Sequence, residues 1–300
     1  MKNLLFTCAL STAIWTGTAL SEEPALQLAR LEAGSQPQQS AVSGLWQALN
    51  AEKLKLRSAS VLVEDQSGNI VYAKQVNEAR PIASITKLMT AMVILDSALD
   101  LQEKITITKD DRDLLRLTGS RLKYGATLTR EELIRLALMA SENRASNALA
   151  RTYPDGKEAF VAAMNNKAGA LGMHDSRFAD PAGLDAGNVA SARDIVKMVR
   201  AAQTYPLIRE ATTTRTIAVR PYKGRGELKF GNTNRLLKHK SWAIKLSKTG
   251  YINEAGRCLV MQAEIADQPL VIVLLNSFGK LTPYGDSNRI RKWIERGVDG

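Results

Sequence analysis

The sequence contains two strongly apolar runs near its C-terminal end, RCLVMQAEIA at 257–266 and PLVIVLLN at 269–276. Each run has the length and the apolar character of a β-strand, and only two residues separate them. A third strand-like run, AIKLSKT at 243–249, precedes them. Connections this short join antiparallel neighbours, because a parallel crossover needs a dozen or more residues. The C-terminal third therefore predicts an antiparallel sheet.

Two further strands are predicted near the other end of the chain. SASVLVED at 58–65 and IVYAK at 70–74 flank the turn sequence QSGN, which is the pattern of a hairpin. A final helix is predicted at 287–297, where the apolar residues share one face. Strands at both ends with helices between them indicate an α+β fold, in which helices cover an antiparallel sheet of about five strands.

The middle of the chain, about residues 101–210, has the pattern of an all-helical insert. Thr129 and Glu132 form a capping box, which predicts the start of a helix that continues through 140. Asp155 and Glu158 repeat the pattern and predict a helix that ends at the glycine at 172.

The N-terminus has the pattern of a secretory signal peptide. Lys2 supplies the positive charge, LLFTCALSTAIW the apolar region and ALS at 19–21 the small residues of a cleavage site. We expect residues 1–21 to be removed and residues 22–57 to form a helix and linker. An uncleaved anchor is the alternative, but this apolar stretch is short for a membrane span. No later stretch approaches the roughly 18 apolar residues of a spanning helix, so no transmembrane segment is expected after cleavage.

The chain has a formal net charge of +11, and its basic residues are concentrated between Arg209 and Lys248. Two interpretations of this region stay open, a solvated face or a surface for an anionic substrate. An exported basic protein is attracted to the anionic polymers of a cell envelope. Nucleic acid is not an expected partner, because the chain has neither zinc-finger spacing nor an aromatic-basic RNA motif.

The sequence lacks the signatures of the commoner catalytic sites. Its two histidines, His174 and His239, have no partner at metal-ligand spacing, and HExxH, CxxC, GxSxG and phosphate-loop motifs are missing. Cys8 lies in the signal peptide, which leaves Cys258 alone in an apolar run, where a buried strand thiol is expected. No metal or cofactor is expected, and the general base of any enzyme here is predicted not to be histidine.

PIASITKLMTAM at 81–92 places a hydroxyl and an amine three residues apart. Ser84 and Lys87 would share one face of a helix predicted over 84–98, which is apolar nearly all round and therefore buried. Serine is a weak nucleophile until a base takes its proton, and burial lowers the pKa of a lysine so that it can act as that base. The alternative is an ordinary helix cap beside a surface lysine.

Two further motifs follow in the chain. SEN at 141–143 lies between two predicted helices, and KTG at 248–250 ends a predicted strand. Each motif alone is consistent with an ordinary turn. A second SxxK, from Ser277 to Lys280, follows a strand and contains a glycine, so we interpret it as a loop. The three motifs in this order, each in a fitting structural context, indicate one catalytic site far more specifically than any motif alone.

The pattern SxxK, SxN and KTG resembles that of the penicillin-recognising serine peptidases and β-lactamases. The chain is most similar to low-molecular-mass penicillin-binding proteins of the D-alanyl-D-alanine carboxypeptidase/endopeptidase family. The segments RPIASITKLMTAMVILD, LALMASENRASNALA, LGMHDSRFADPAGL and SKTGYINEAGRCLVM extend this similarity over about residues 57–296. The resemblance implies a β-lactamase/DD-peptidase-like fold, with a transpeptidase-like catalytic domain over 58–297. The C-terminal β-domain and membrane anchor of many carboxypeptidase relatives are not expected here.

The resemblance also implies a role for each motif residue. Ser84 would attack a D-alanyl carbonyl with Lys87 as general base, and a positive charge on Lys248 would help to keep Lys87 neutral. Ser141 and Lys248 would transfer a proton to the leaving amine, and Asn143 would orient Lys87 and the substrate amide. Thr249 would bind the substrate carboxylate, and Gly250 would let its strand approach closely. The backbone N–H groups of Ser84 and Tyr251 would form the oxyanion hole.

The implied function is a serine DD-peptidase that hydrolyses D-alanyl bonds of peptidoglycan in the periplasm through an acyl-enzyme, with β-lactams as covalent inhibitors. Carboxypeptidase relatives usually carry Ser-Gly-Asn, whereas the SEN motif here is similar to the endopeptidase branch. Cleavage of crosslinked muropeptides is therefore favoured over D-alanyl-D-alanine carboxypeptidase activity. A β-lactamase is less favoured, because the ExxLN segment of class A enzymes is missing. A non-catalytic wall-binding protein is a further alternative, and the residues do not identify which proteins, if any, bind this chain.

Overall fold

The computed structural model describes Gly44 and residues 46–298. The chain divides into a unit of residues 1–44, of which only Gly44 is described, and a unit of residues 45–300 that contains the fold. The expected signal peptide, residues 1–21, and most of the expected helix and linker lie outside the described residues. Within the described part, no helix combines the length and the apolar character needed to cross a membrane.

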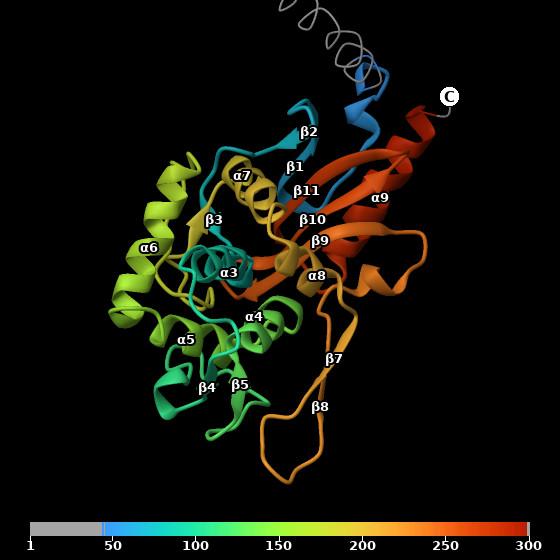
Figure 1. Ribbon diagram of the computed structural model, residues 1–300. Helices are drawn as coiled ribbons and strands as arrows, with labels where there is room; N and C mark the ends of the chain where they lie inside the picture. Colours follow the sequence, from blue (N-terminus) through green and yellow to red (C-terminus); the bar gives the residue numbers. More distant parts are fainter. Residues whose placement is uncertain (1–43, 45, 299–300) are drawn as a thin grey trace, which may run out of the picture. The chain divides into compact units, whose positions relative to one another are not determined.

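A five-stranded antiparallel sheet forms the centre of the fold, with the strand order β2-β1-β11-β10-β9 (Figure 1). Its strands are β1 (Ser58–Asp65), β2 (Ile70–Lys74), β9 (Ala243–Ile252), β10 (Gly256–Ile265) and β11 (Gln268–Ser277). All five lie where the sequence predicts strands, and the α+β fold is confirmed. The sheet joins the two ends of the described chain, because Ser58 of β1 pairs with Ser277 of β11.

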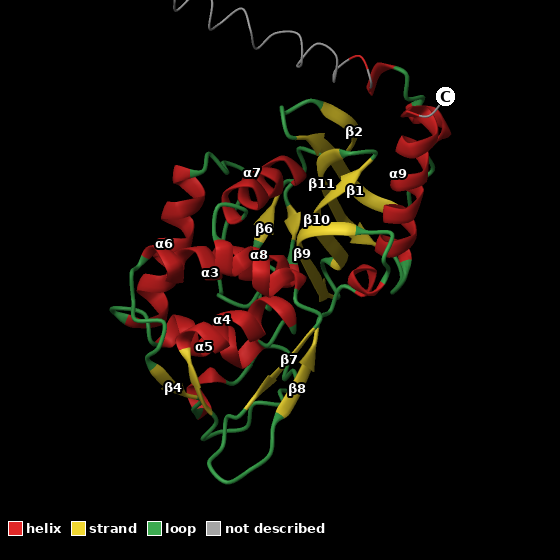
Figure 2. Cartoon of the chain, turned by 45° about the vertical axis from the view of Figure 1, so that its right-hand side comes forward, coloured by secondary structure: helices red, strands yellow, loops and turns green. Residues whose placement is uncertain are grey.

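Helices cover both faces of the sheet. α9 (Thr282–Val298) contacts β1, β10 and β11 on one face, and α7 (Ala192–Ala202) contacts the same strands from the other side (Figure 2). Asp286 fixes α9 to the first strand, because its buried carboxylate accepts hydrogen bonds from the Ser58 backbone N–H at 2.7 Å and from the Ser58 hydroxyl at 2.6 Å.

The helical part of the chain packs beside the sheet and surrounds α3. Its helices are α3 (Lys87–Asp96), α4 (Arg130–Met139), α5 (Asn143–Arg151), α6 (Gly156–Ala170) and α8 (Pro206–Thr213). The expected burial of the first of these is confirmed, since Leu88, Met89 and Met92 of α3 are fully buried. One continuous apolar cluster runs from this helix into α4 and into the strands of the sheet, so both parts share a core.

The insert is not all-helical, contrary to the sequence expectation. It also contains three short strands, β4 (Lys104–Thr106), β5 (Thr127–Thr129) and β6 (Val189–Ala190). β4 pairs with β5, and β6 pairs with β3 (Arg80–Pro81). Strands of two or three residues are too short to carry the alternating pattern by which a strand is recognised in a sequence.

One of the two predicted capping boxes is correct. The Thr129 hydroxyl accepts from the Glu132 N–H at the start of α4, and the Glu132 carboxylate accepts from the Thr129 N–H at 2.8 Å. The second prediction is wrong. Asp155 precedes α6 with a φ of +60° and makes no side-chain capping bond, because a tight turn from Tyr153 to Gly156 directs the chain there.

A hairpin formed by β7 (Thr216–Val219) and β8 (Leu228–Gly231) was not predicted. It extends away from the sheet and helices at the lower end of Figure 1. The remaining elements are short 3-10 helices, labelled η1 (Ala51–Lys53), η2 (Ala83–Thr86), η3 (Lys109–Asp111) and η4 (Arg235–Lys238).

Candidate active site

Ser84 lies inside η2, the 3-10 turn that leads directly into α3. The predicted helix start is therefore corrected: α3 begins at Lys87, and Ser84 is not a helix cap. The physical reason lies one residue earlier, where Ala83 has a left-handed φ of +47°. This conformation turns the chain after β3 and places the serine on a tight bend before the helix.

Two glycines, each on a different neighbouring segment, pack directly against the backbone of this bend. A Cβ at Gly183, whose φ is +76°, would lie 1.9 Å from the Ala83 carbonyl oxygen. A Cβ at Gly250 on β9 would lie 2.8 Å from the Ile82 carbonyl oxygen and 3.2 Å from the Ser84 nitrogen. Both segments approach Ser84 so closely that only glycine fits at these two positions.

The Lys87 amine lies directly beside Ser84. Its Nζ donates hydrogen bonds to Ser84 Oγ at 2.9 Å, to Asn143 Oδ1 at 2.8 Å and to the Ala182 carbonyl oxygen. The side chain is fully buried. Burial lowers the pKa of Lys87 to about 8, although the carboxylates of Asp180, Glu142 and Asp113 act in the opposite direction.

A second Ser–Lys pair faces the first from β9 and from the SEN segment. Lys248 Nζ donates to Ser141 Oγ at 3.0 Å and to the Thr249 carbonyl oxygen at 3.0 Å. Burial lowers the pKa of Lys248 well below its ordinary value, and the positive charge of Lys87 lowers it further. The burial effect on Lys87 agrees with the sequence expectation, whereas the charge effect runs from Lys87 to Lys248 and not, as expected, from Lys248 to Lys87.

A loop that the sequence motifs do not contain holds Asn143 in place. The Asn143 side-chain amide donates to Thr118 Oγ1 at 2.9 Å, and that hydroxyl donates to Asp113 Oδ2 at 2.7 Å. The pKa of Asp113 is lowered overall. Burial raises it, but the carboxylate accepts hydrogen bonds from the Thr118 hydroxyl and from the backbone N–H groups of Arg116, Thr118 and Leu115, and these outweigh burial. A chain of contacts therefore runs from Asp113 to Lys87.

A second such loop contains Asp180. Its buried carboxylate accepts from the backbone N–H groups of Ala182, at 2.5 Å, and of Gly183, at 2.7 Å. This turn presents the Ala182 carbonyl to Lys87 and brings Gly183 against Ala83. The Asp-Pro-Ala-Gly sequence indicates a turn, but nothing in it indicates that the turn supports the site.

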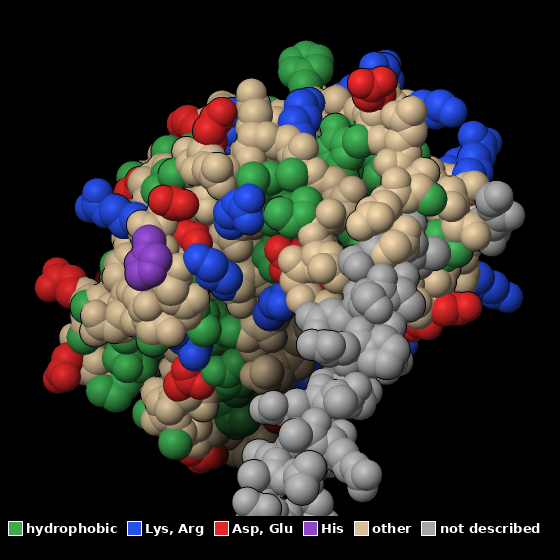
Figure 3. Space-filling view, turned by 90° about the horizontal axis from the view of Figure 1, so that it is seen from above, with side chains coloured by type: hydrophobic (Ala, Val, Ile, Leu, Met, Phe, Trp, Pro, Cys, Tyr) green, Lys and Arg blue, Asp and Glu red, His purple; other side chains and the backbone are tan. Residues whose placement is uncertain are grey.

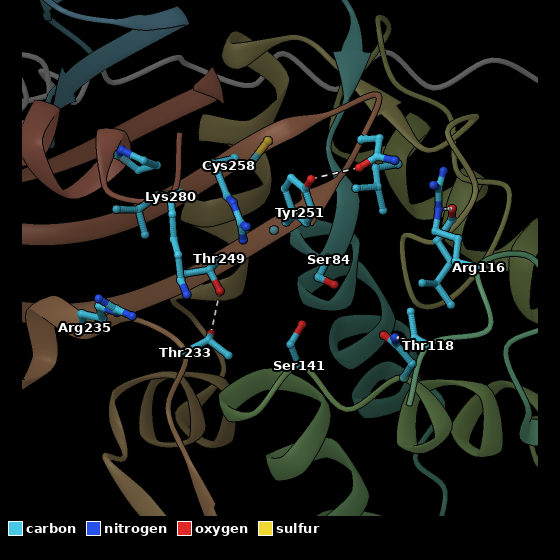
Figure 4. A pocket seen from close by; sticks show the side chains of 18 of the residues that line it. Ser84, Arg116, Thr118, Ser141, Thr233, Arg235, Thr249, Tyr251, Cys258 and Lys280 are labelled. Atoms are coloured by element: carbon cyan, nitrogen blue, oxygen red, sulfur yellow. Dashed lines mark hydrogen bonds between the residues drawn. The ribbon is translucent and has the colours of Figure 1, made fainter. Parts of the chain in front are cut away.

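Ser84, Ser141, Asn143, Thr249 and Gly250 line one cleft of about 700 Å³, while Lys87 and Lys248 are buried behind its wall. Figure 4 shows Ser84 and Ser141 facing the same opening, with Thr249 and Thr233 on one side and Thr118 and Arg116 on the other. The Thr249 hydroxyl donates to Thr233 Oγ1 at 2.6 Å. Three further residues that the sequence did not indicate, Thr233, Arg235 and Lys280, line the cleft beyond Thr249.

The end of the cleft nearest Arg116 is bridged by an ion pair. Arg116 of the loop donates to the Leu184 carbonyl oxygen and forms an ion pair with Glu254 of the β9–β10 turn at 2.8 Å. Tyr251 also lines the cleft, with about half of the residue exposed and the Arg257 guanidinium 3.7 Å from its ring centre.

This arrangement provides a hydroxyl nucleophile, a buried amine to accept its proton, and a second hydroxyl–amine pair across the cleft. No group of side chains suited to holding a metal ion occurs among the described residues. Cys258 is buried as expected, and burial raises the pKa of its thiol to about 11, so it stays protonated.

Comparison with known proteins assigns the chain to a peptidase family. A family model described as D-alanyl-D-alanine carboxypeptidase, peptidase family S11, matches residues 47–279. The chain is 46% identical to a D-alanyl-D-alanine endopeptidase of Pseudomonas aeruginosa, over 81% of this chain and 79% of the relative. It is 42% identical to a D-alanyl-D-alanine endopeptidase of Escherichia coli, over 83% of this chain and 81% of the relative.

Solved structures agree with the sequence comparison. The crystal structure of the Streptomyces K15 DD-transpeptidase superimposes with a TM-score of 0.74 at 26% identity, over 80% of this chain and 97% of that one. A D-alanyl-D-alanine carboxypeptidase from Mycobacterium tuberculosis gives a TM-score of 0.72 at 28% identity, over 80% and 91% of the two chains.

Proposed function

This chain belongs to the D-alanyl-D-alanine carboxypeptidase family and is a serine-type DD-peptidase, and from that premise we propose that Ser84 is its nucleophile. The observation that carries the proposal is the hydrogen bond of 2.9 Å between Ser84 Oγ and the buried Nζ of Lys87. A lysine with a pKa of about 8 is partly neutral at neutral pH, so it can accept the serine proton.

In the proposed acylation step, Lys87 Nζ takes the proton of Ser84 as Oγ attacks the D-alanyl carbonyl carbon. The tetrahedral intermediate collapses when the carbon–nitrogen bond breaks. Ser141, which bonds to Lys248 at 3.0 Å, gives a proton to the leaving amine. The amine gains the proton that Ser84 lost, relayed through the two lysine amines and the Ser141 hydroxyl. Water then cleaves the ester and restores Ser84.

We propose that the backbone N–H groups of Ser84 and Tyr251 stabilise the oxyanion of the intermediate. The support is the packing at Gly250, which brings β9 against the backbone of Ser84. We assign the substrate carboxylate to Thr249, because the hydroxyls of Thr249 and Thr233 and the cations of Arg235 and Lys280 lie together at one end of the cleft.

The bond hydrolysed is proposed to be the D-alanyl crosslink between peptidoglycan stem peptides, as in endopeptidases of the penicillin-binding protein 7 type. The support is the sequence identity of 46% and 42% to two proteins with the name D-alanyl-D-alanine endopeptidase. D-alanyl-D-alanine carboxypeptidase activity is the second candidate. Relatives with that name are less similar, for example one from Bacillus subtilis at 32% identity over 61% of its length.

We further propose that residues 58–297 are the catalytic domain, and that the mature chain works in the periplasm after removal of residues 1–21. The support is the signal-peptide pattern together with the substrate, which is a polymer of the bacterial cell wall. β-Lactams, which resemble the D-alanyl-D-alanine terminus, are expected to acylate Ser84.

Incubation with purified crosslinked muropeptide dimers tests the bond that is cleaved. We expect dimers to be converted to monomers, and dimers that persist while monomeric pentapeptides lose D-alanine would contradict the endopeptidase assignment. Intact-mass spectrometry after benzylpenicillin treatment tests the nucleophile. We expect one adduct on the Ser84 peptide, none in Ser84→Ala, and an unchanged adduct in Ser277→Ala, whose serine begins the other SxxK sequence.

A further inference from the structure

The sequence left open whether its basic region is a solvated face or a binding surface, and the structure gives that region a definite form. We propose that the β7–β8 hairpin and the hollow at its base are a second binding surface, which holds acidic peptide arms of the wall polymer outside the cleft. The proposal rests on the proposed function, because it concerns where the same polymer is held while one of its crosslinks is cleaved.

The hollow is continuous with the active site. It has a volume of about 540 Å³, and Ser141 and Asn143 line both it and the catalytic cleft. Its outer wall is formed by Phe230 and Gly231 of β8 and by Arg121, whose guanidinium lies 4.7 Å from the centre of the Phe230 ring. A substrate peptide that extends out of the cleft past Ser141 therefore reaches the base of the hairpin.

Exposed cations follow the hairpin from its base to its tip. They are Arg215, Lys223, Arg225 and Lys229 on the hairpin, and Arg121 and Lys123 on the segment beside it. Within the described residues, none of these six forms an ion pair with a carboxylate, whereas Arg220 is paired with Glu227 at 2.9 Å. Cations that lie close together without carboxylate partners repel one another, and binding of an anionic ligand reduces this repulsion.

The hairpin is held against the helical part of the chain, so these cations belong to one surface. The Thr127 N–H donates to the Pro221 carbonyl oxygen at 2.9 Å, and the Lys123 N–H donates to the Tyr222 hydroxyl at 2.8 Å. Charge is distributed differently elsewhere. Figure 3 looks onto the end of the molecule away from the hairpin tip and shows Lys and Arg side chains mixed with Asp and Glu.

The spread of the cations indicates the chemistry of the ligand. A single phosphate would need donors that converge on one point, whereas the hairpin cations are spread from the start of β7 through the β7–β8 loop and into β8. An extended polymer with repeated carboxylates fits this spacing, and the stem peptides of peptidoglycan carry free carboxylates. The hairpin would thus hold uncleaved peptide arms while one arm occupies the cleft.

The test measures binding to insoluble peptidoglycan sacculi in the Ser84→Ala background, where cleavage cannot remove the ligand. The hairpin variant carries Lys223→Glu, Arg225→Glu and Lys229→Glu. The matched control carries Lys53→Glu, Lys55→Glu and Lys157→Glu, three exposed cations elsewhere with the same total charge change. We expect the hairpin variant to bind about tenfold or more weakly than the parent at low salt, and the control to change binding less than about twofold.

Amidation of the sacculus carboxylates should remove the difference between the parent and the hairpin variant. Equal binding of the two triple variants, or retention on phosphatidylglycerol vesicles or DNA but not on sacculi, would overturn the proposal.

If the hairpin variant unfolds, the double variant Lys223→Ser and Arg225→Ser replaces it, with folding checked by circular dichroism. Dimer cleavage by the wild type is measured separately, so a failure of the proposed function is distinguishable from a failure of this surface.

Discussion

Lys87 and Lys248 are buried amines that form no ion pair with a carboxylate in the described part of the chain. Burial disfavours the charged form of each, and this is the property that a general base of high intrinsic pKa needs. A fully hydrated lysine at either position would stay protonated at neutral pH and could not accept a proton. The burial of these two amines is therefore unfavourable for stability but necessary for reactivity.

We predict that acylation of Ser84 depends on pH through Lys87. With a pKa of about 8, about one tenth of Lys87 is neutral at pH 7 and about nine tenths at pH 9. The second-order rate constant for acylation by benzylpenicillin should therefore rise about tenfold over this range. Stopped-flow or quenched mass-spectrometric kinetics would measure it, with melting temperatures at each pH as the control. A flat profile would exclude Lys87 as the base.

A methyl group at Gly183 should damage both stability and reactivity. Gly183→Ala puts a Cβ on the Ala83 carbonyl and a side chain at a φ of +76°, so we expect a loss of at least about 2 kcal/mol in the free energy of unfolding and slower acylation. Gly226→Ala is the matched control, because its Cβ would meet no atom within 4 Å. Urea unfolding compares the two, and equal stabilities would refute the close packing.

At the scale of elements, the strands of the sheet and most helices could be predicted because long segments carry strong periodicity. The capping box at Thr129 is a local signal and was also sufficient. The hairpin β7–β8 was missed because its strands have only four residues each, too few to show a clear alternating pattern. The predicted start of the helix at Ser84 was wrong, since Ala83 has a left-handed backbone that no residue pattern indicates, and α3 begins at Lys87.

Some residues of the candidate site could be predicted from the sequence and others could not. Residues with motif spacing, such as Ser84, Lys87 and Lys248, could be named from the sequence, and the structure brings them together. Asp113 and Asp180 could not be named, because each acts through backbone N–H groups of its own loop. Such contacts depend on how a loop folds onto a distant element, which periodicity and motif spacing do not encode.

The loop from Asp113 to Thr118 yields a prediction about positioning. Thr118→Val keeps the side-chain shape but removes the hydroxyl that accepts from Asn143, so acylation should slow by roughly three- to tenfold. Thr118→Ser retains the hydroxyl and should restore the rate. The midpoint of the pH profile should fall in the valine variant, because Asn143 would support the Lys87 ammonium less well. A slower valine variant with an unmoved midpoint would indicate general loosening instead.

At the scale of the whole molecule, the cleft lies where the sheet part and the helical part meet. Ser84 precedes α3, Ser141 comes from the insert and Lys248 from the edge of the sheet. The two parts also share one continuous apolar cluster. Neither part can assemble the site without the other, so activity reports on the folding of the complete unit.

Unfolding should accordingly be a single cooperative transition. Loss of helical circular dichroism, loss of tryptophan fluorescence and loss of labelling by fluorescent penicillin are expected to have the same midpoint in urea. Labelling that disappears at a lower urea concentration than circular dichroism would mean that the insert opens independently.

The pairing of β1 with β11 has a consequence for how the chain acquires its structure. Ser58 and Ser277 are 219 residues apart, yet their hydroxyls lie 2.7 Å from each other. Closing so long a loop is entropically costly, and chains dominated by such distant pairings fold slowly. During synthesis, the β1–β2 hairpin must wait for its neighbour until β11 has emerged. The first strand to be made is thus among the last to be completed on both of its edges.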